Sequence, residues 1–175
     1  MVEKKGLLHV YTGNGRGKTT SAIGLAVRAL GRNWKVYLIQ FMKGYYNYGE
    51  LQTLSKFENL KIIQFGTPEF VSKKHPKKED IEHAVEGLNF AKELIMRGEY
   101  DMVILDEINV AVDFGLLDKN EIIELIKNRP SHVELILTGR NAPSEFIELA
   151  DYVTEMKEIK HPFMKGLLAR EGIEY

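Results

Sequence analysis

The sequence predicts an α/β fold built on a doubly wound, mostly parallel sheet of about six strands, with helices on both faces. Two features of the pattern support this prediction. Apolar runs of strand length recur along the chain, and most of them are nearly continuous rather than alternating. Continuous runs are typical of strands that are buried on both faces, as in a parallel sheet. Helical patterns lie between several of these runs, which is typical of right-handed crossover connections.

The elements follow from apolar spacing and from residues that start or stop them. The expected strands occupy residues 7–12, 35–41, 60–65, 102–106, 133–138 and 152–156. The expected helices occupy residues 19–30, 80–97, 121–127 and 144–150. The first helix would bury a face that consists of Ile23, Ala26, Val27 and Leu30. It would end at Gly31, a residue type that commonly terminates helices.

The longest expected helix, 80–97, carries one apolar stripe and meets Gly98 at its end. The stripe consists of Ile81, Ala84, Val85, Leu88, Ala91 and Leu94. Asp118 precedes Glu121 by the spacing of a capping box, which favours a helix start there. Pro143 is placed to open the last helix, because proline suits a first turn.

Length and composition indicate one globular domain over residues 1–175. Of the 175 residues, 44% are hydrophobic and 28% are charged, and we find no linker, repeat or low-complexity segment. The net charge of −1 favours neither nucleic acid nor an anionic membrane as a partner. The lack of cysteine excludes disulfides, thiolate metal sites and a cysteine nucleophile. The start lacks a signal-peptide core, and no apolar run approaches the roughly 20 residues of a membrane span, so we expect a cytoplasmic protein.

A glycine-rich loop follows the first expected strand and precedes the first expected helix. Residues 12–20 read Thr-Gly-Asn-Gly-Arg-Gly-Lys-Thr-Thr, and this context is typical of a phosphate-binding loop rather than an ordinary tight turn. Glycines let backbone N–H groups face an anion, and the helix N-terminus adds donors and positive dipole. Lys18 would reach phosphate oxygens, and Thr19 would offer its hydroxyl to Mg²⁺. Thr12 stands where the common pattern has glycine, so the loop is either a variant or a broken copy.

Two carboxylates end another apolar strand. Met-Val-Ile-Leu precedes Asp106 and Glu107. Carboxylates at such a position hold Mg²⁺ directly or through water in nucleotide sites. A strand that simply ends in solvated acids is the alternative, but the pairing with the glycine loop favours the metal site. In a hydrolase, Glu107 would be the candidate for orienting a water.

Three further segments each admit two interpretations. Arg140 follows the strand 133–138 and would contact phosphate or ribose, or else lie on a loop surface. The basic run 73–78 is a lid over phosphates or, more commonly, a solvated loop. The aromatic run 45–48 lines a large flat ligand or packs a loop. The five histidines show no metal-ligand spacing.

Five segments taken together carry more information than each alone. They are Tyr-Thr-Gly-Asn-Gly-Arg-Gly-Lys-Thr-Thr-Ser-Ala at 11–22, Gln-Phe-Met-Lys-Gly at 40–44, Leu-Asp-Glu-Ile-Asn-Val-Ala at 105–111, Leu-Thr-Gly-Arg-Asn-Ala-Pro at 137–143, and a tail with Lys160-His161-Pro162-Phe163, Gly166, Ala169 and Gly172-Ile173-Glu174-Tyr175. In this combination the chain resembles the corrinoid adenosyltransferases of the P-loop type (ATP:cob(I)alamin or cob(I)yrinic acid a,c-diamide adenosyltransferase). The resemblance runs from near residue 7 to the end, and the short phosphate loop is the family's own pattern.

The resemblance implies a P-loop NTPase fold of the RecA-like type and a defined reaction. Co(I) of a reduced corrinoid would attack C5′ of ATP, form a cobalt–carbon bond and release triphosphate, in adenosylcobalamin biosynthesis or salvage. ATP would lie in the reversed sense, so that C5′ rather than the γ-phosphate is presented. Because Co(I) is a strong nucleophile and no proton leaves the reacting carbon, no general base is needed. Catalysis then reduces to positioning and charge neutralisation.

The resemblance also implies roles for individual residues. Lys18 and Glu107 are the expected catalytic residues, because they would neutralise the departing triphosphate, Glu107 through Mg²⁺. The expected ATP-binding residues are Gly13, Asn14, Gly15, Arg16, Gly17, Lys18, Thr19, Thr20 and Arg140. The expected metal ligands are Thr19, Glu107 and Asp106. Phe70 is expected to contact the corrinoid, and Asn14 is expected near the ribose.

This sequence departs from the family pattern at two places. Many members carry Phe-x-Trp where this chain has Phe70-Val71-Ser72, so the phenylalanine is kept and the tryptophan is not. Members often have an N-terminal segment that folds over the site, whereas this sequence begins almost at its first strand, so we expect that cover to be missing or to come from elsewhere. The family also implies a homodimer and an electron-donating reductase that makes Co(I) from Co(II).

Two other functions stay open from the residues alone. A P-loop ATPase or small-molecule kinase would use Asp106 or Glu107 on water or a substrate hydroxyl and would release ADP. A corrinoid-carrying or nucleotide-sensing module with a degenerate loop would not be an enzyme. The intact Lys18, Thr19 and Glu107 argue against that module.

Overall fold

The computed structural model describes residues 5–44 and 48–174 and is built on one parallel sheet of six strands. The strands are β1 (Leu8–Thr12), β2 (Val36–Phe41), β3 (Leu60–Phe65), β4 (Met102–Asp106), β5 (Glu134–Thr138) and β6 (Tyr152–Glu155). Their order across the sheet is β3-β2-β4-β5-β1-β6, and every neighbouring pair is parallel. This confirms the predicted fold class, and it agrees with the P-loop NTPase-like fold that the resemblance implies.

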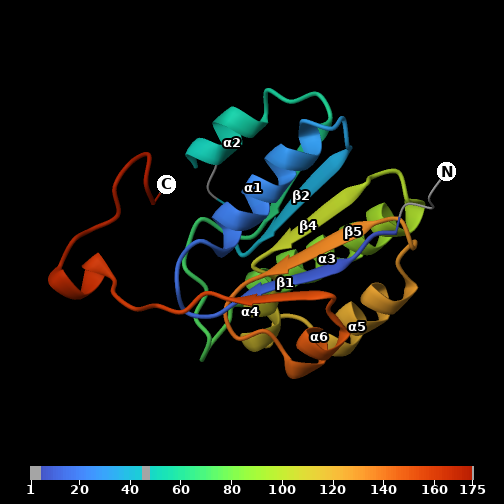
Figure 1. Ribbon diagram of the computed structural model, residues 1–175. Helices are drawn as coiled ribbons and strands as arrows, with labels where there is room; N and C mark the ends of the chain where they lie inside the picture. The colour runs from blue at the N-terminus through green and yellow to red at the C-terminus, as the bar shows by residue number, and fades with distance from the viewer. Residues whose placement is uncertain (1–4, 45–47, 175) are drawn as a thin grey trace.

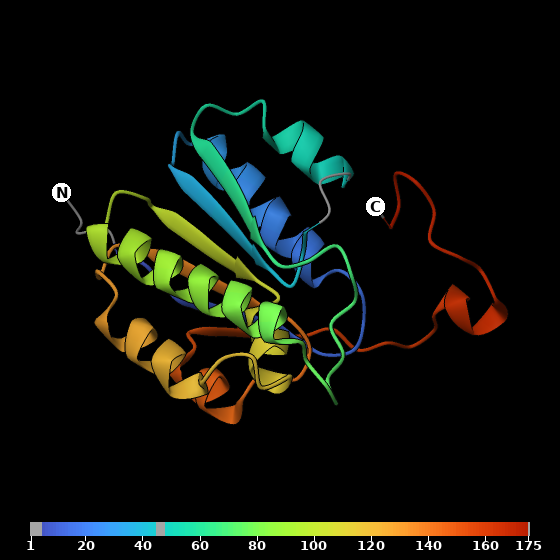
Figure 2. The same cartoon turned by 180° about the vertical axis from the view of Figure 1, so that it is seen from behind.

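Helices cover both faces of the sheet (Figures 1 and 2). They are α1 (Lys18–Leu30), α2 (Gly49–Leu54), α3 (Lys78–Arg97), α4 (Ile108–Asp113), α5 (Lys119–Asn128), α6 (Ser144–Leu149) and the 3₁₀ helix η1 (Pro162–Lys165). Helices α1 and α2 lie on one face, and α3 to α6 lie on the other. Strands β2, β3, β4 and β5 each supply both cores by alternation: in β2, Leu38 packs toward α1, whereas Ile39 packs toward α3.

The expected strands are confirmed within one residue at each end, but the buried face differs from the expected one in two helices. Strand β6 is exposed throughout, because it is the edge strand beside β1. In α1, Val27 is 47% exposed, whereas Ala22, Ala26 and Leu30 are buried. Ala26 lies at the middle of the buried stripe. Val27 is rotated about 100° around the helix axis from Ala26, so its side chain lies outside that stripe.

The same rotation explains a second correction in α3. Ile81 and Val85 are 37% and 43% exposed, while Ala84 and Leu88, on the neighbouring side of the helix, are buried. The short helices α2, α4 and η1 were not predicted, because six residues or fewer give no full apolar period.

The parallel sheet gathers the functional segments at one edge. The loop after β1, Asp106 at the end of β4 and Thr138 at the end of β5 all lie at carboxyl ends of strands, where such folds bind ligands. Strand β5 lies between β1 and β4, so the phosphate loop and Asp106 come from strands that are separated by one strand. Within the described part of the chain, no helix combines the length and apolarity needed to cross a bilayer.

Candidate functional site

The phosphate loop, residues 13–17, depends on its glycines for shape. Gly13 and Gly17 have φ of 94° and 108°, in the left-handed region that side chains disfavour. The loop also lies against the segment after β6, because Gly15 N–H donates to Met156 O over 2.6 Å. A Cβ on Gly13 or Gly15 would meet Met156 O at 2.5 or 2.7 Å. Substituting either glycine would therefore push this segment away from the loop.

Lys18 is the first residue of α1 and folds back over the loop. Its Nζ donates to Gly13 O at 2.8 Å and to Gly15 O at 2.6 Å. Burial lowers the pKa of Lys18, while the nearby charge of Glu107 opposes this effect. The ammonium group is thus fixed inside the loop, where it would meet a bound phosphate.

Asp106 is fully buried and accepts from four side chains, which come from α1, β2, β5 and the loop after β2. Its Oδ1 accepts from the Thr19 hydroxyl at 2.8 Å and the Thr138 hydroxyl at 2.6 Å. Its Oδ2 accepts from Lys43 Nζ at 2.7 Å and Gln40 Nε2 at 3.0 Å. Burial would raise the pKa of Asp106, but Lys43 and the three side-chain hydrogen bonds from Lys43, Thr138 and Thr19 hold it below its usual value. Asp106 is therefore a charged anchor for Thr19.

Glu107 differs sharply from its neighbour. Its backbone is left-handed, with φ of 63°, and its N–H donates to Thr138 Oγ1 at 3.0 Å. Left-handed backbone is uncommon outside glycine and is a typical feature of functional sites. Burial and the charge of Asp106 raise the pKa of Glu107. Two adjacent carboxylates thus have pKa values shifted in opposite directions, which is typical of sites that bind charge.

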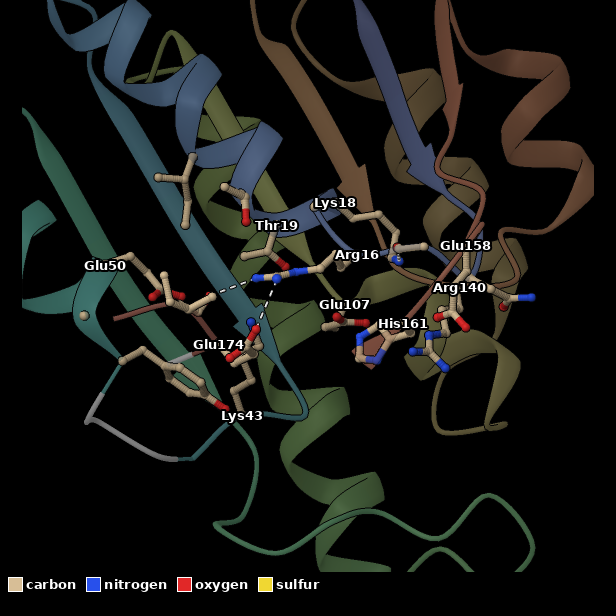
Figure 3. A pocket seen from close by; sticks show the side chains of 18 of the residues that line it. Arg16, Lys18, Thr19, Lys43, Glu50, Glu107, Arg140, Glu158, His161 and Glu174 are labelled. Carbon is tan, nitrogen blue, oxygen red and sulfur yellow. Dashed lines mark hydrogen bonds and ion pairs between the residues drawn. The ribbon is translucent and has the colours of Figure 1, made fainter. Parts of the chain in front are cut away.

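These residues meet in one cleft of about 510 Å³ (Figure 3). Of the predicted site residues, the cleft is lined by Asn14, Gly15, Arg16, Gly17, Lys18, Thr19, Thr20, Glu107 and Arg140. Gly13 and Asp106 do not line it but touch residues that do, Lys18 and Thr19 respectively. Phe70 lies elsewhere, on the loop between β3 and α3, with its side chain fully exposed.

Arg16 reaches across the cleft to the end of the chain (Figure 3). Its Nη1 donates to Glu174 Oε1 at 3.1 Å, and its Nη2 donates to Ile173 O at 2.9 Å. Sequence reasoning expected Arg16 to serve phosphate and gave the tail no role. The structure thus places Ile173 and Glu174, the last two residues that it describes, at the candidate site.

Several residues at the site were not singled out from the sequence. Four of them line the cleft: Lys43, Glu158, His161 and Glu174. The other two, Gln40 and Thr138, donate hydrogen bonds to Asp106. The segments 40–44 and 137–143 and the tail belong to the resemblance, and this was the available signal for all of them except Glu158.

Three segments admit two interpretations each from the sequence. In the first, Arg140 lines the cleft, as a phosphate or ribose contact would. In the basic run, Lys73 donates to both oxygens of Asp113 at 2.7 Å, and neither residue lines the cleft. Within the aromatic run, Tyr48 lines the cleft, and residues 45–47 lie outside the described part.

Comparison with known proteins places this site in a family. Residues 4–175 match the model of "ATP:corrinoid adenosyltransferase BtuR/CobO/CobP". A corrinoid adenosyltransferase of Sinorhizobium sp is 37% identical over 176 residues, covering 99% of this chain and 82% of that protein. Proteins of the same name from Pseudomonas aeruginosa and Escherichia coli (strain K12) are 35% and 34% identical, with 99% of this chain and 85% and 87% of those proteins covered.

The match extends over almost the whole chain and includes every segment that lines the cleft. It does not favour the ATPase or kinase alternative, because the family and these relatives are named as adenosyltransferases. The enzyme class is therefore that of a transferase that uses ATP and a corrinoid. This chain belongs to the ATP:corrinoid adenosyltransferase family.

Proposed function

We propose that the cleft binds ATP for attack by Co(I) of a reduced corrinoid on C5′. The cobalt–carbon bond forms with the Co(I) electron pair, the C5′–O bond breaks, and triphosphate leaves with that bond's electrons. The observation that carries this proposal is the convergence of Lys18, Thr19, Glu107 and Arg140 on one cleft beside the phosphate loop. Four basic side chains, Arg16, Lys18, Lys43 and Arg140, line it. Lys43 is paired with Asp106, and the other three suit a polyphosphate leaving group.

Charge neutralisation would be the main catalytic contribution of the protein. Lys18 would contact triphosphate oxygens from inside the loop, and backbone N–H groups of residues 13–18 would surround them. The reversed sense of ATP is part of the proposal and rests on the family resemblance. In that sense the phosphates occupy the loop and C5′ faces the corrinoid. Asn14, which lines the cleft, is the candidate contact for the ribose.

The donor set fits Mg²⁺. This cation prefers hard oxygen ligands, takes few of them from the protein and completes its shell with phosphate and water. Glu107 supplies a half-buried carboxylate whose raised pKa reflects desolvation and the adjacent negative charge of Asp106, and a bound cation would stabilise its ionised form. Thr19 supplies a hydroxyl, and Mg²⁺ held by the pair would neutralise charge on the triphosphate.

Asp106 has a different position from the other expected metal ligands. Each of its oxygens already accepts two hydrogen bonds, one pair from hydroxyls and one from Lys43 and Gln40. We therefore assign Asp106 to orienting Thr19, with any contact to Mg²⁺ through water. Asp106 would thus support the metal site through Thr19 rather than bind the metal directly.

Phe70 is proposed to contact the corrinoid. Its ring is fully exposed, as expected for an apolar group that is covered by a large ligand rather than by the protein. The loop that carries Phe70 begins at Gly66. A Cβ added at this glycine would lie 2.6 Å from the backbone nitrogen of Lys43. The start of the Phe70 loop therefore packs on a segment that also reaches the nucleotide cleft.

The remaining expectations concern assembly and location. A homodimer is supported by exposed apolar side chains on the tail, which include Ile159, Phe163, Met164, Leu167 and Leu168. One sheet with two continuous cores supports a single domain over residues 1–175. A reductase that supplies Co(I) and a cytoplasmic location remain predictions from the sequence and the resemblance.

An anaerobic assay tests the reaction. The protein is mixed with ATP, Mg²⁺ and chemically reduced corrinoid, and the spectral change of Co–C bond formation is followed together with phosphate products. The expected result is adenosylcorrinoid and inorganic triphosphate in equal amounts. Accumulation of ADP without adenosylcorrinoid would instead support the ATPase or kinase alternative.

A further inference from the structure

The tail, residues 156–174, begins and ends against the phosphate loop. It begins where Met156 O accepts from Gly15 N–H at 2.6 Å. From there it leaves the body of the molecule and turns back, as both views show (Figures 1 and 2). It ends where Ile173 O and Glu174 Oε1 accept from Arg16 at 2.9 and 3.1 Å. The loop residue Arg16 is thus held by groups that lie about 160 positions later in the sequence.

Glu174 is held within the tail before it meets Arg16. Its Oε2 accepts from the backbone N–H and the Nε of Arg170 at 2.8 and 3.2 Å, and its Oε1 accepts from Arg170 Nη2 at 3.3 Å. Gly172, with φ of 74°, makes the turn between these residues. Hydrogen bonds from Arg170 lower the pKa of Glu174, so its carboxylate is ionised at neutral pH. The orientation of the Glu174 carboxylate is therefore set by Arg170 within the tail.

The charge balance of this cluster favours anion binding. One carboxylate, Glu174, lies between two guanidinium groups, Arg16 and Arg170, so the three together carry a formal charge of +1. A carboxylate facing triphosphate alone would repel it, whereas here its charge is compensated locally. Two of the five donors of an arginine are used by the tail, which leaves the others for a ligand.

Holding Arg16 also reduces the entropic cost of using it. A free arginine side chain loses rotamer freedom when it is fixed, and this loss opposes binding. The side chain of Arg16 is half exposed, so without the tail it would sample many rotamers outside the cleft. With Ile173 and Glu174 in place, the guanidinium already lies in the cleft that contains Lys18 and Thr19.

We propose that Glu174 is a positioning residue that holds Arg16 in the cleft for the triphosphate of the nucleotide. This inference rests on the proposed function of the cleft as a triphosphate site. It assigns the C-terminal end of the chain a role in nucleotide affinity. Glu174 acts through Arg16 and touches no reacting atom.

A double-mutant cycle with inorganic triphosphate and Mg²⁺ tests the proposal by calorimetry. Glu174→Ala should weaken triphosphate binding about fivefold, because Arg16 regains its rotamer freedom. Glu171→Ala is the matched control, since Glu171 is an exposed carboxylate of the same tail, and it should bind as the wild type does. In an Arg16→Ala background, Glu174→Ala should have no further effect, because the two residues act as one unit.

Two results would overturn the positioning role. Glu174→Ala binding triphosphate as well as or more tightly than wild type would make Glu174 a bystander or a competitor for Arg16. Additive losses in the double variant would show that the two residues act separately. The adenosyl-transfer assay on wild type distinguishes the underlying function: if the cycle is non-additive but no adenosylcorrinoid forms, the proposed function fails and the positioning role stands.

A steady-state measurement adds a readout that general damage to the fold would not mimic. Glu174→Ala should raise the KM for ATP about fivefold and leave both kcat and the KM for corrinoid near wild type, since ground-state affinity is what changes. Glu174→Gln keeps an acceptor oxygen and should restore part of the lost affinity. A fall in kcat with unchanged KM for ATP would contradict the proposal.

Discussion

The Thr19 hydroxyl donates to Asp106 Oδ1 over 2.8 Å and joins the start of α1 to the end of β4. Asp106 in turn is paired with Lys43 at 2.7 Å, and its side chain has no exposure to solvent. The orientation of a candidate metal ligand, Thr19, therefore depends on a buried ion pair. Changes at that pair should affect stability and catalysis together.

Asp106→Asn should destabilise the protein by about 3 kcal/mol, because it leaves the ammonium of Lys43 buried without a counter-charge. Urea unfolding monitored by circular dichroism measures this loss. Lys43→Met alone should also destabilise, by leaving the Asp106 carboxylate uncompensated. The double variant should be more stable than the sum of the single losses predicts. Additive losses would show that the pair contributes nothing specific.

The same pair predicts a pH dependence of stability. The folded-state pKa of Asp106 lies below its value in the unfolded chain, about 3.9. Its contribution is therefore fully present above about pH 4 and is lost as pH falls through the folded value. Between pH 5 and pH 3, the wild type should lose more stability than the double variant at positions 43 and 106. Parallel pH profiles for the two proteins would contradict the assigned shift.

Much of the fold could be predicted because its signals are local. Continuous apolar runs marked the strands of the parallel sheet, and glycines with Lys18 marked the phosphate loop. The donors around Asp106 could not be found this way, because Gln40 and Lys43 come from β2 and the loop after it, Thr138 comes from β5, and they meet Asp106 only through the pairing of the strands. Glu174 reaches Arg16 through tertiary structure alone, and nothing in its neighbourhood in the sequence indicates that contact.

Glu107→Gln should reduce activity about 100-fold, because a neutral amide is a weak partner for Mg²⁺ and a charge that stabilises the leaving triphosphate is lost. It should also stabilise the ligand-free protein at neutral pH. The raised pKa of Glu107 means that its favourable contribution is present below the unfolded value, about 4.3, and is lost as pH rises through the folded value.

Thermal unfolding without nucleotide, at pH 4 and pH 7, checks this sign for Glu107. The variant should gain stability over wild type at pH 7 and not at pH 4. For wild type, Mg²⁺ affinity in the presence of triphosphate should weaken as pH falls through the raised pKa, since protonation removes the ligand charge. A Glu107→Gln variant with normal Mg²⁺ dependence would show that the metal is held elsewhere.

Lys18→Ala should abolish most activity, by about 1000-fold, because fixed positive charge is removed from the triphosphate inside the loop. Triphosphate affinity should fall as well, and calorimetry measures it without any corrinoid. Lys61→Ala is a suitable control, since Lys61 is an exposed lysine of β3. Near-normal turnover in Lys18→Ala would show that the phosphates lie elsewhere.

Phe70→Ala should raise the KM for the corrinoid roughly tenfold, because an aromatic ring that is covered by ligand contributes about 1.5–3 kcal/mol of burial. The KM for ATP should not change, since Phe70 does not line the nucleotide cleft and lies on the loop between β3 and α3. Initial rates measured against each substrate separate the two effects. Phe57→Ala removes a different phenylalanine, which is 38% exposed, and should leave both constants near wild type. An unchanged corrinoid KM in Phe70→Ala would place the corrinoid on another surface, and a rise in the ATP KM alone would assign Phe70 to the nucleotide instead.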